Sequence, residues 1–235
     1  MIWKRLKIES GSEVYPPKPA SLLLARIAAK IAAPNQKILD ACCGSGIVAI
    51  AVAKFVPKSN VIASDINSEA ILTTKKNAKK NRANVLAIQS DLFAEFSDCE
   101  FDLITIHPPA VPYLPGKNWG MSNGMGVATN GGIDGSELVI RSILEAKRCL
   151  KKNGRLLLLL PHWCNTKKAF KELYANYKNV SKLAEKRIEF FPATTGNPEK
   201  EMLEHAYRLA KKGQIRIEFK NGKPYSYASV IMAVK

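Results

Sequence analysis

The chain lacks the features that mark secreted, metal-binding and membrane proteins. Its five cysteines are an odd number with no C-x-x-C spacing, so they form neither a disulfide framework nor a zinc signature. We therefore expect no metal and a reducing, cytoplasmic setting. The longest apolar run, Leu156 to Leu160, is far too short to span a bilayer, and the first residues carry no apolar segment with a cleavage site. The sequence predicts a soluble, unexported protein without a membrane partner.

Acidic residues are scarce, at 20 against 36 lysines and arginines, which gives a formal net charge of +16. Such an excess attracts nucleic acid, ribosomes or acidic proteins, but it does not say what is done to them. Several basic clusters, such as Lys75-Lys76, fall on expected helices, where a solvated outer face is the alternative explanation. At 235 residues the chain can form one α/β domain whose hydrophobic core is large enough to be stable without disulfides or structural metals.

One stretch joins an apolar strand to an apolar helix through a glycine turn. Residues 37–41 predict the strand, Gly44 and Gly46 fall in the turn, and a helix follows to about Lys54. Glycines let the backbone approach a ligand closely, and the N-terminus of the helix points at whatever lies in the turn. The pattern departs from G-x-G-x-x-G, because Ala49 stands three residues after Gly46, so a simple structural turn is the alternative.

Strands and helices alternate along the chain, which predicts a parallel sheet covered on both faces. The expected strands span 37–41, 60–64, 85–89, 101–106, 155–160 and 186–191, with a final hairpin of 214–219 and 227–234 around Asn221-Gly222. The expected helices span 20–33, 47–54, 68–82, about 137 to Asn153-Gly154, 166–177 and 199–211.

Four polar residues follow the first four strands and should share one rim of the sheet, where ligands gather: Asp40, Asp65, Asp91 and His107. Asp65 lies 19 residues after Gly46, where a carboxylate can accept hydrogen bonds from both ribose hydroxyls. Asp91 could accept from an exocyclic adenine amine. Together with the glycine turn, these residues predict an adenosine ligand rather than a dinucleotide.

The motifs resemble those of class I S-adenosylmethionine-dependent methyltransferases, and within them the HemK/PrmC-like glutamine methyltransferases. The matching stretches are Val14-Tyr15-Pro16-Pro17, Asp40-Ala41-Cys42-Cys43-Gly44-Ser45-Gly46, Ser64-Asp65-Ile66-Asn67, Ser90-Asp91-Leu92-Phe93, Pro108-Pro109 and Gly131-Gly132-Ile133-Asp134-Gly135 before a helix with Arg141. The resemblance implies a Rossmann-like fold with a seven-stranded, mostly parallel sheet of order 3-2-1-4-5-7-6. It also implies S-adenosylmethionine as cofactor, held by Asp40, Cys42, Gly44, Gly46, Asp65, Ile66, Asp91 and Leu92.

We expect one methyltransferase domain over residues 1–235, with an N-terminal flap at 1–18, a glycine-rich lid loop at 110–133 and an insertion at 192–226 before the last strand. Three prolines, Pro16, Pro17 and Pro19, exclude regular helix over residues 12–19 and make this segment extended. A loop as long as the lid is typically functional or disordered, and its tryptophan and methionines favour a lid.

The expected catalytic residues depart from the resemblance. The relatives carry Asn-Pro-Pro-Tyr, whereas this chain has His107-Pro108-Pro109-Ala110. A neutral imidazole accepts through one ring nitrogen only, and alanine offers no stacking surface. We expect His107 to orient the nucleophile or take its proton, Pro108 to offer a carbonyl, and Tyr15, Ala110 and Trp119 to bound the acceptor. The departure argues against a release-factor glutamine as the acceptor.

The sequence leaves three functions open. The first is methyl transfer to an amide or amine nitrogen of a protein or nucleic acid, with RNA or the ribosome as a further partner through the basic surface. The second is methyl transfer to nitrogen or oxygen of a small molecule, favoured by the altered tetrad and the lid. The third is a protein that binds the cofactor without turnover, against which the acidic strand ends argue.

Overall fold

The computed structural model describes residues 6–117, 119, 123–190 and 199–235. The helices are α1 (Pro19–Ile31), α2 (Ile47–Phe55), α3 (Ser68–Asn81), α4 (Asn123–Val127), α5 (Glu137–Cys149), α6 (Thr166–Asn176) and α7 (Lys200–Lys211). The strands are β1 (Lys37–Ala41), β2 (Asn60–Asp65), β3 (Val85–Gln89), β4 (Phe101–Ile106), β5 (Leu150–Pro161), β6 (Lys178–Glu189), β7 (Glu218–Lys220) and β8 (Lys223–Val234). None of these helices is both long and apolar enough to cross a membrane.

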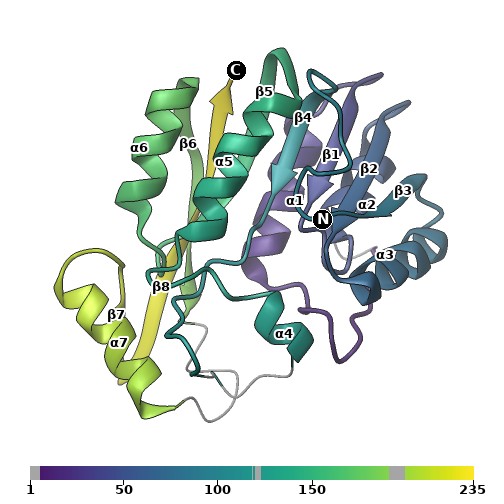
Figure 1. Ribbon diagram of the computed structural model, residues 1–235. Coiled ribbons are helices and arrows are strands. Elements are labelled where there is room, and N and C mark those ends of the chain that lie inside the picture. Colours follow the sequence, from purple (N-terminus) through teal and green to yellow (C-terminus); the bar gives the residue numbers. More distant parts are fainter. Residues whose placement is uncertain (1–5, 118, 120–122, 191–198) are drawn as a thin grey trace.

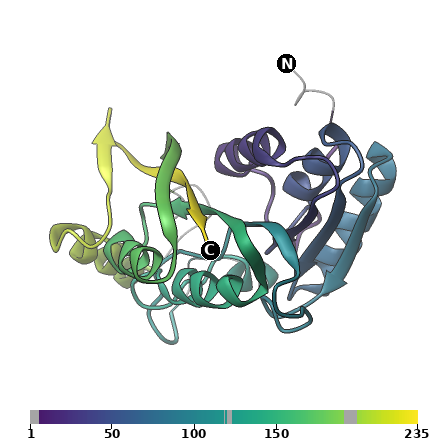
Figure 2. The ribbon, with the colours of Figure 1, turned by 90° about the horizontal axis from the view of Figure 1, so that it is seen from above.

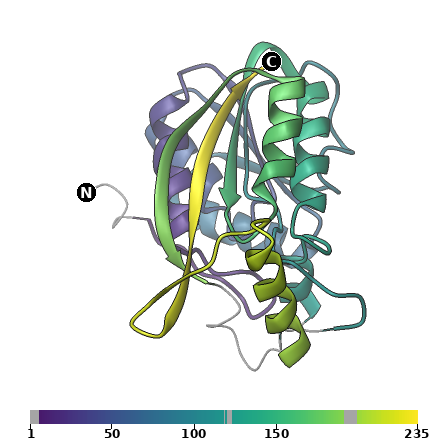
Figure 3. The same ribbon diagram turned by 90° about the vertical axis from the view of Figure 1, so that its left-hand side faces the viewer.

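Within the described residues the strands form one sheet in the order β3-β2-β1-β4-β5-β8-β6, and β7 pairs with β8 (Figure 1). Strands β1 to β5 run parallel, whereas β8 lies antiparallel between β5 and β6. The strand order implied by the resemblance is confirmed, with β8 as the seventh strand and β7 as an addition. Figure 3 shows the long strands β6 and β8 side by side.

The two faces of the sheet bury separate cores. In β5, Leu157 and Leu159 pack in the cluster that holds α1 and α2, while Leu156, Leu158 and Leu160 pack in the cluster that holds α5 and α6. Successive residues of a strand point to opposite faces, so an unbroken leucine run requires helices on both sides. Figure 2 shows α1 and α5 on opposite sides of the sheet. The predicted α/β architecture is confirmed.

Several predicted boundaries are wrong. In the C-terminal hairpin, the strands expected at 214–219 and 227–234 are instead β7 (Glu218–Lys220) and β8 (Lys223–Val234). The helix expected to reach Asn153 ends at Cys149, and β5 begins at Leu150, which pairs with Phe101. The register shifts beside this pair, and Asn153 has a positive φ of 61°, so the Asn-Gly sequence marks an irregular strand rather than a helix end. The strand expected from Lys186 begins at Lys178 instead. Its first residues are mostly polar because β6 is an edge strand, so the apolar alternation is missing.

The lid loop is partly ordered by α4 and is fastened to α7, which belongs to the predicted insertion. The backbone N–H of Leu114 donates to Sδ of Met202 at 3.4 Å, and Lys117 forms ion pairs with Glu199 and Glu201. His205 donates through Nε2 to the carbonyl oxygen of Ile133 at 2.6 Å. The insertion therefore positions the lid. The loop expected at 193–198 lies outside the described residues.

Candidate functional site

The turn after β1 is shaped by packing as well as by access. Gly46 caps α2 with φ of 78°, and a Cβ at this position would lie 2.8 Å from the side chain of Thr74 on α3. Its N–H donates to the carbonyl oxygen of Cys43. Gly46 lines neither of the two cavities described below. The structure therefore gives Gly46 a packing role, and its predicted cofactor contact stays a prediction.

Asp40 is 3% exposed and also lines neither cavity. Its Oδ2 accepts from the N–H of Ala49 at 3.1 Å, and its Oδ1 accepts from the hydroxyl of Thr105 at 2.7 Å. Burial raises the pKa of Asp40 to about 7, and the two donors act against that rise. The carboxylate ties the start of α2 to β4 and so positions the turn, and its predicted contact with the cofactor stays a prediction.

Asp65 lies at the end of β2 in a cavity of about 220 Å³. Its Oδ2 accepts from the N–H of Gly44 at 2.9 Å and its Oδ1 from the N–H of Asn67 at 3.0 Å. Burial raises the pKa of Asp65. A carboxylate that loses solvation is stabilised by further hydroxyl donors. Beside it, Gly44 has φ of 52°, and the nearest atom to the position of its missing Cβ is the carbonyl oxygen of Tyr15 at 3.9 Å. The chemistry of this corner fits a ribose.

The other end of the small cavity holds an ion pair that sequence reasoning missed. Both carboxylate oxygens of Asp91 accept from Arg141 on α5, at 3.0 and 3.1 Å. Cys42, Ile66 and Leu92 line the same cavity. Their predicted contacts with the cofactor stay predictions. The role of Asp91 at an adenine amine stays a prediction, because its oxygens already have a partner.

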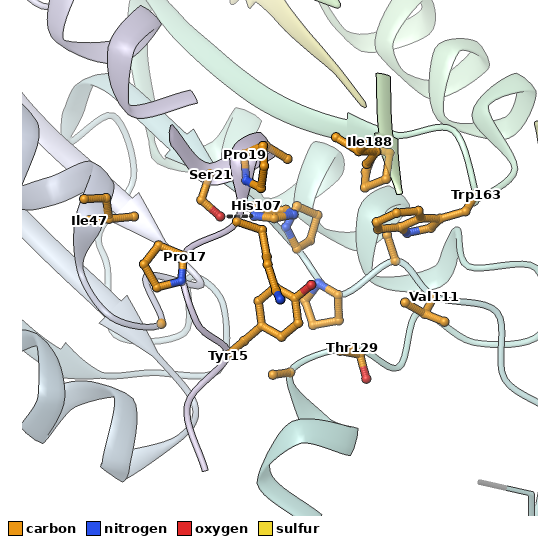
Figure 4. A pocket seen from close by; sticks show the side chains of 18 of the residues that line it. Tyr15, Pro17, Pro19, Ser21, Ile47, His107, Val111, Thr129, Trp163 and Ile188 are labelled. Carbon is orange, nitrogen blue, oxygen red and sulfur yellow. Dashed lines mark hydrogen bonds between the residues drawn. The ribbon is translucent and has the colours of Figure 1, made fainter. Parts of the chain in front are cut away.

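A larger cavity of about 550 Å³ adjoins the small one. The two share five lining residues: Tyr15, Gly44, His107, Pro109 and Ala128. Pro108 and Ala110 line the large cavity as well. In Figure 4, Tyr15, Pro17, His107 and Trp163 surround this space. The predicted catalytic residues thus lie where the two cavities meet.

His107 is held between the cavities without a charged neighbour. Its Nδ1 lies 3.5 Å from Oγ of Ser21 on α1 (Figure 4), and either atom can donate, depending on the tautomer. Burial lowers the pKa of His107 to about 4. The imidazole is therefore neutral near pH 7, when it can accept one hydrogen bond and donate one. Ser21 had no signal in the sequence, since it is an ordinary residue of an amphipathic helix.

Trp119 does not close the pocket as we predicted. It is fully buried, donates through Nε1 to the carbonyl oxygen of Pro112 at 2.9 Å, and packs edge-on against Tyr113. It lines neither cavity. From the sequence alone, an apolar residue in a glycine-rich loop can either line a pocket or pack in the hydrophobic core, and nothing in the pattern distinguishes the two.

The far wall of the large cavity comes from β6, β8 and the segment after β5, and sequence reasoning missed all of it. The residues are Trp163, Lys186, Arg187, Ile188, Glu189 and Tyr225. They carry no motif, and they come from three separate segments: Trp163, residues 186–189, and Tyr225. The flap also holds the lid: Oε2 of Glu13 accepts from the N–H of Gly124 at 2.9 Å. No cluster of three or more metal-ligating side chains occurs in the described part of the chain.

The strand order and the carboxylate beside the glycine turn define a class I S-adenosylmethionine-dependent methyltransferase. The methyltransferase small domain family matches residues 16–114. A Lactobacillus delbrueckii ribosomal protein L11 methylase has the same fold, with a TM-score of 0.60 and 18% identity over 98% of this chain and 85% of its own.

Sequence relatives narrow the class. A Methanocaldococcus jannaschii protein assigned as a protein N5-glutamine methyltransferase is 33% identical over 154 residues, which cover 66% of this chain and 75% of that protein. The Lactococcus lactis release factor glutamine methyltransferase is 36% identical over 112 residues, 47% of this chain and 41% of the relative. The Francisella tularensis ribosomal protein uL3 glutamine methyltransferase is 34% identical over 125 residues, and the chain spans 40% of its length. The chain belongs to the HemK/PrmC-like protein glutamine methyltransferase family, and S-adenosylmethionine is its methyl donor.

Proposed function

We propose that the protein transfers a methyl group to an amide or amine nitrogen of a protein side chain. The observation that carries this proposal is the meeting of two cavities at His107 and Pro109, one cavity suited to a nucleoside and the other to an acceptor. The names of the relatives, which act on release factors and ribosomal protein uL3, support a protein acceptor over a small molecule.

In this proposal the small cavity holds the cofactor. Asp65 accepts from the ribose hydroxyls, and the backbone at Cys42 and Gly44 makes room for the methionine part. Ile66 and Leu92 lie against the adenine. The bound sulfonium supplies an electrophilic methyl group, and the protein's own task is to align the nucleophile with it.

His107 and Pro108 would orient the acceptor nitrogen. Because the pKa of His107 is lowered to about 4, the ring serves as a neutral hydrogen-bond partner rather than as a strong base. A ring nitrogen accepts one N–H of the acceptor, and the carbonyl oxygen of Pro108 accepts another. Tyr15 and Ala110 bound the acceptor side chain, and the compact alanine leaves room beside it.

The proposal extends to organisation and place in the cell. Residues 1–235 act as a single methyltransferase domain, with the flap at 1–18, the lid at 110–133 and the insertion at 192–226 around the acceptor. The net charge of +16 favours contact with acidic partners such as the ribosome. A protein that modifies the translation apparatus would act in the cytoplasm.

The test is transfer of a radiolabelled methyl group from S-adenosylmethionine into a fractionated lysate. We expect the label in protein, and enzymatic digestion followed by mass spectrometry should place it on a glutamine, asparagine or lysine nitrogen. The variant His107→Ala should label at least about tenfold more slowly, as expected for loss of an orienting group. Label that appears only in nucleic acid or in small molecules would overturn the proposal.

A further inference from the structure

The mouth of the large cavity gathers positive charge. Three of the residues that line the cavity are cationic and exposed: Lys18 just before α1, and Lys186 and Arg187 near the end of β6. Glu189 is the single acidic residue among those that line it. A concave, low-dielectric site concentrates the field of such charges.

None of Lys18, Lys186 and Arg187 forms a contact ion pair within the described residues. Arg187 does interact with Glu218, whose pKa is lowered mainly by Arg216 and in part by Arg187. Nearby in β6, by contrast, Lys182 pairs with Glu185 at 3.1 Å. The guanidinium of Arg187 lies 5.1 Å from the ring centroid of Tyr225, which orients it and leaves its N–H donors for another ligand.

The cavity is apolar inside and cationic outside. Val111, Pro161, Trp163 and Ile188 form the inner wall. In Figure 4 the side chains of Ile188 and Trp163 lie at the cavity beyond His107. Lys186 lies two residues before Ile188 on the same strand, so it shares the face of Ile188 and stands at the edge of the cavity. This arrangement fits a side chain that enters end-on while its backbone stays at the mouth.

We propose that the mouth formed by Lys18, Lys186 and Arg187 selects an acceptor segment with acidic residues beside the methylated side chain. The inference rests on the proposed protein acceptor and names the class of segment that this site takes. Carboxylates that flank the acceptor meet the three cations, while the acceptor itself reaches His107 and Pro109.

A nucleic acid backbone fits the charge distribution less well. One other exposed basic cluster, Lys75, Lys76 and Lys79, lies in the second half of α3. This helix follows β2 and runs back along the sheet, so its C-terminal half lies toward the amino ends of the strands, away from the cavities. The lysines of α3 therefore do not extend the mouth into a track for a polyanion.

The experiment uses nine-residue peptides with a central glutamine, asparagine or lysine, flanked on each side by two glutamates, two alanines or two lysines. Labelled S-adenosylmethionine reports kcat/KM for each peptide. We expect the glutamate-flanked peptide to exceed the lysine-flanked one by at least about tenfold, since charge pairs at an interface of this kind discriminate by like-charge repulsion as well as attraction. Equal rates for the three flanks would overturn the inference and leave the proposed function standing.

The double variant Lys186→Glu/Arg187→Glu should reverse the preference, and the matched control Lys75→Glu/Lys76→Glu should keep it. Both variants alter exposed side chains, and calorimetric titration of S-adenosylmethionine checks that cofactor binding is retained. If oligouridylate inhibits the parent protein but not Lys186→Glu/Arg187→Glu, and the three peptide flanks give equal rates, the mouth would be assigned to nucleic acid instead. Cofactor binding with no peptide labelled would overturn the proposed function, and this inference with it.

Discussion

Replacing Gly46 by alanine should destabilise the fold in two ways, through the positive φ of the backbone and through overlap of the new methyl group with Thr74. The residue has φ of 78°, where a Cβ costs about 1–2 kcal/mol. The new methyl group would lie 2.8 Å from Cγ2 and Oγ1 of Thr74, a fully buried side chain with one stiff rotamer axis. Relief of such an overlap typically costs a further ~1–3 kcal/mol. We expect Gly46→Ala to lower the free energy of unfolding by about 3 kcal/mol and the Tm by roughly 6–12 °C.

Urea unfolding monitored by circular dichroism measures this change, and Gly222→Ala is the matched control. Gly222 has a similar φ of 73°, in the hairpin between β7 and β8, but nothing lies within 4 Å of its missing Cβ. The control should therefore lose only the backbone part, about 1 kcal/mol. In the background of Thr74→Ala, the substitution at Gly46 should cost about 1 kcal/mol less. Equal losses for Gly46→Ala and Gly222→Ala would refute the packing role of Gly46.

Two further predictions concern the cavities. Asp65→Asn should weaken the binding of S-adenosylmethionine by tenfold or more in calorimetric titration, because a charge-assisted hydrogen bond is worth about 1.5–3 kcal/mol. The control Asp98→Asn should leave the affinity unchanged, since Asp98 pairs with Arg148 away from both cavities. Equal affinities of the two variants would remove Asp65 from the site. Burial lowers the pKa of His107 from 6.5 to about 4, so between these values the unfolded chain binds a proton that the folded chain does not. The free energy of unfolding should therefore fall by about 2 kcal/mol for this partly exposed ring as the pH drops from 7 to 4.5. Urea titrations at several pH values should show that His107→Asn loses this part of the pH dependence of stability. The same pH dependence in the variant and the parent protein would contradict the assigned burial.

The elements that the sequence predicted well are those with dense local signals. The first four strands are apolar runs, and each was placed within a residue of its observed ends. The Asn221-Gly222 hairpin followed from turn chemistry, and both residues have positive φ. The start of β6 was missed because its residues are mostly polar. A strand at the edge of a sheet need not alternate apolar and polar residues.

The site was predicted in part, along the rim that the motifs mark. Asp65, His107 and Pro109 lie at the cavities, as expected of strand ends in a parallel sheet. Asp40 and Gly46 share the same motif but turn inward, and a motif alone does not say which of its residues touch a ligand. The pairing of Arg141 with Asp91 and that of Ser21 with His107 join residues about fifty and ninety positions apart, so no local pattern could reveal these pairs.

By itself the sequence determined the class of fold, the glycine turn and the acidic residue of a nucleoside site, because periodicity and turn chemistry are local properties of the chain. The tertiary structure decided how the rim is used. Folding desolvates His107 and lowers its pKa, buries Asp40 beneath the turn, and brings the end of β6 against the start of α1 to form the cationic mouth. These outcomes depend on contacts between distant segments, whose energies exist only once the sheet has formed.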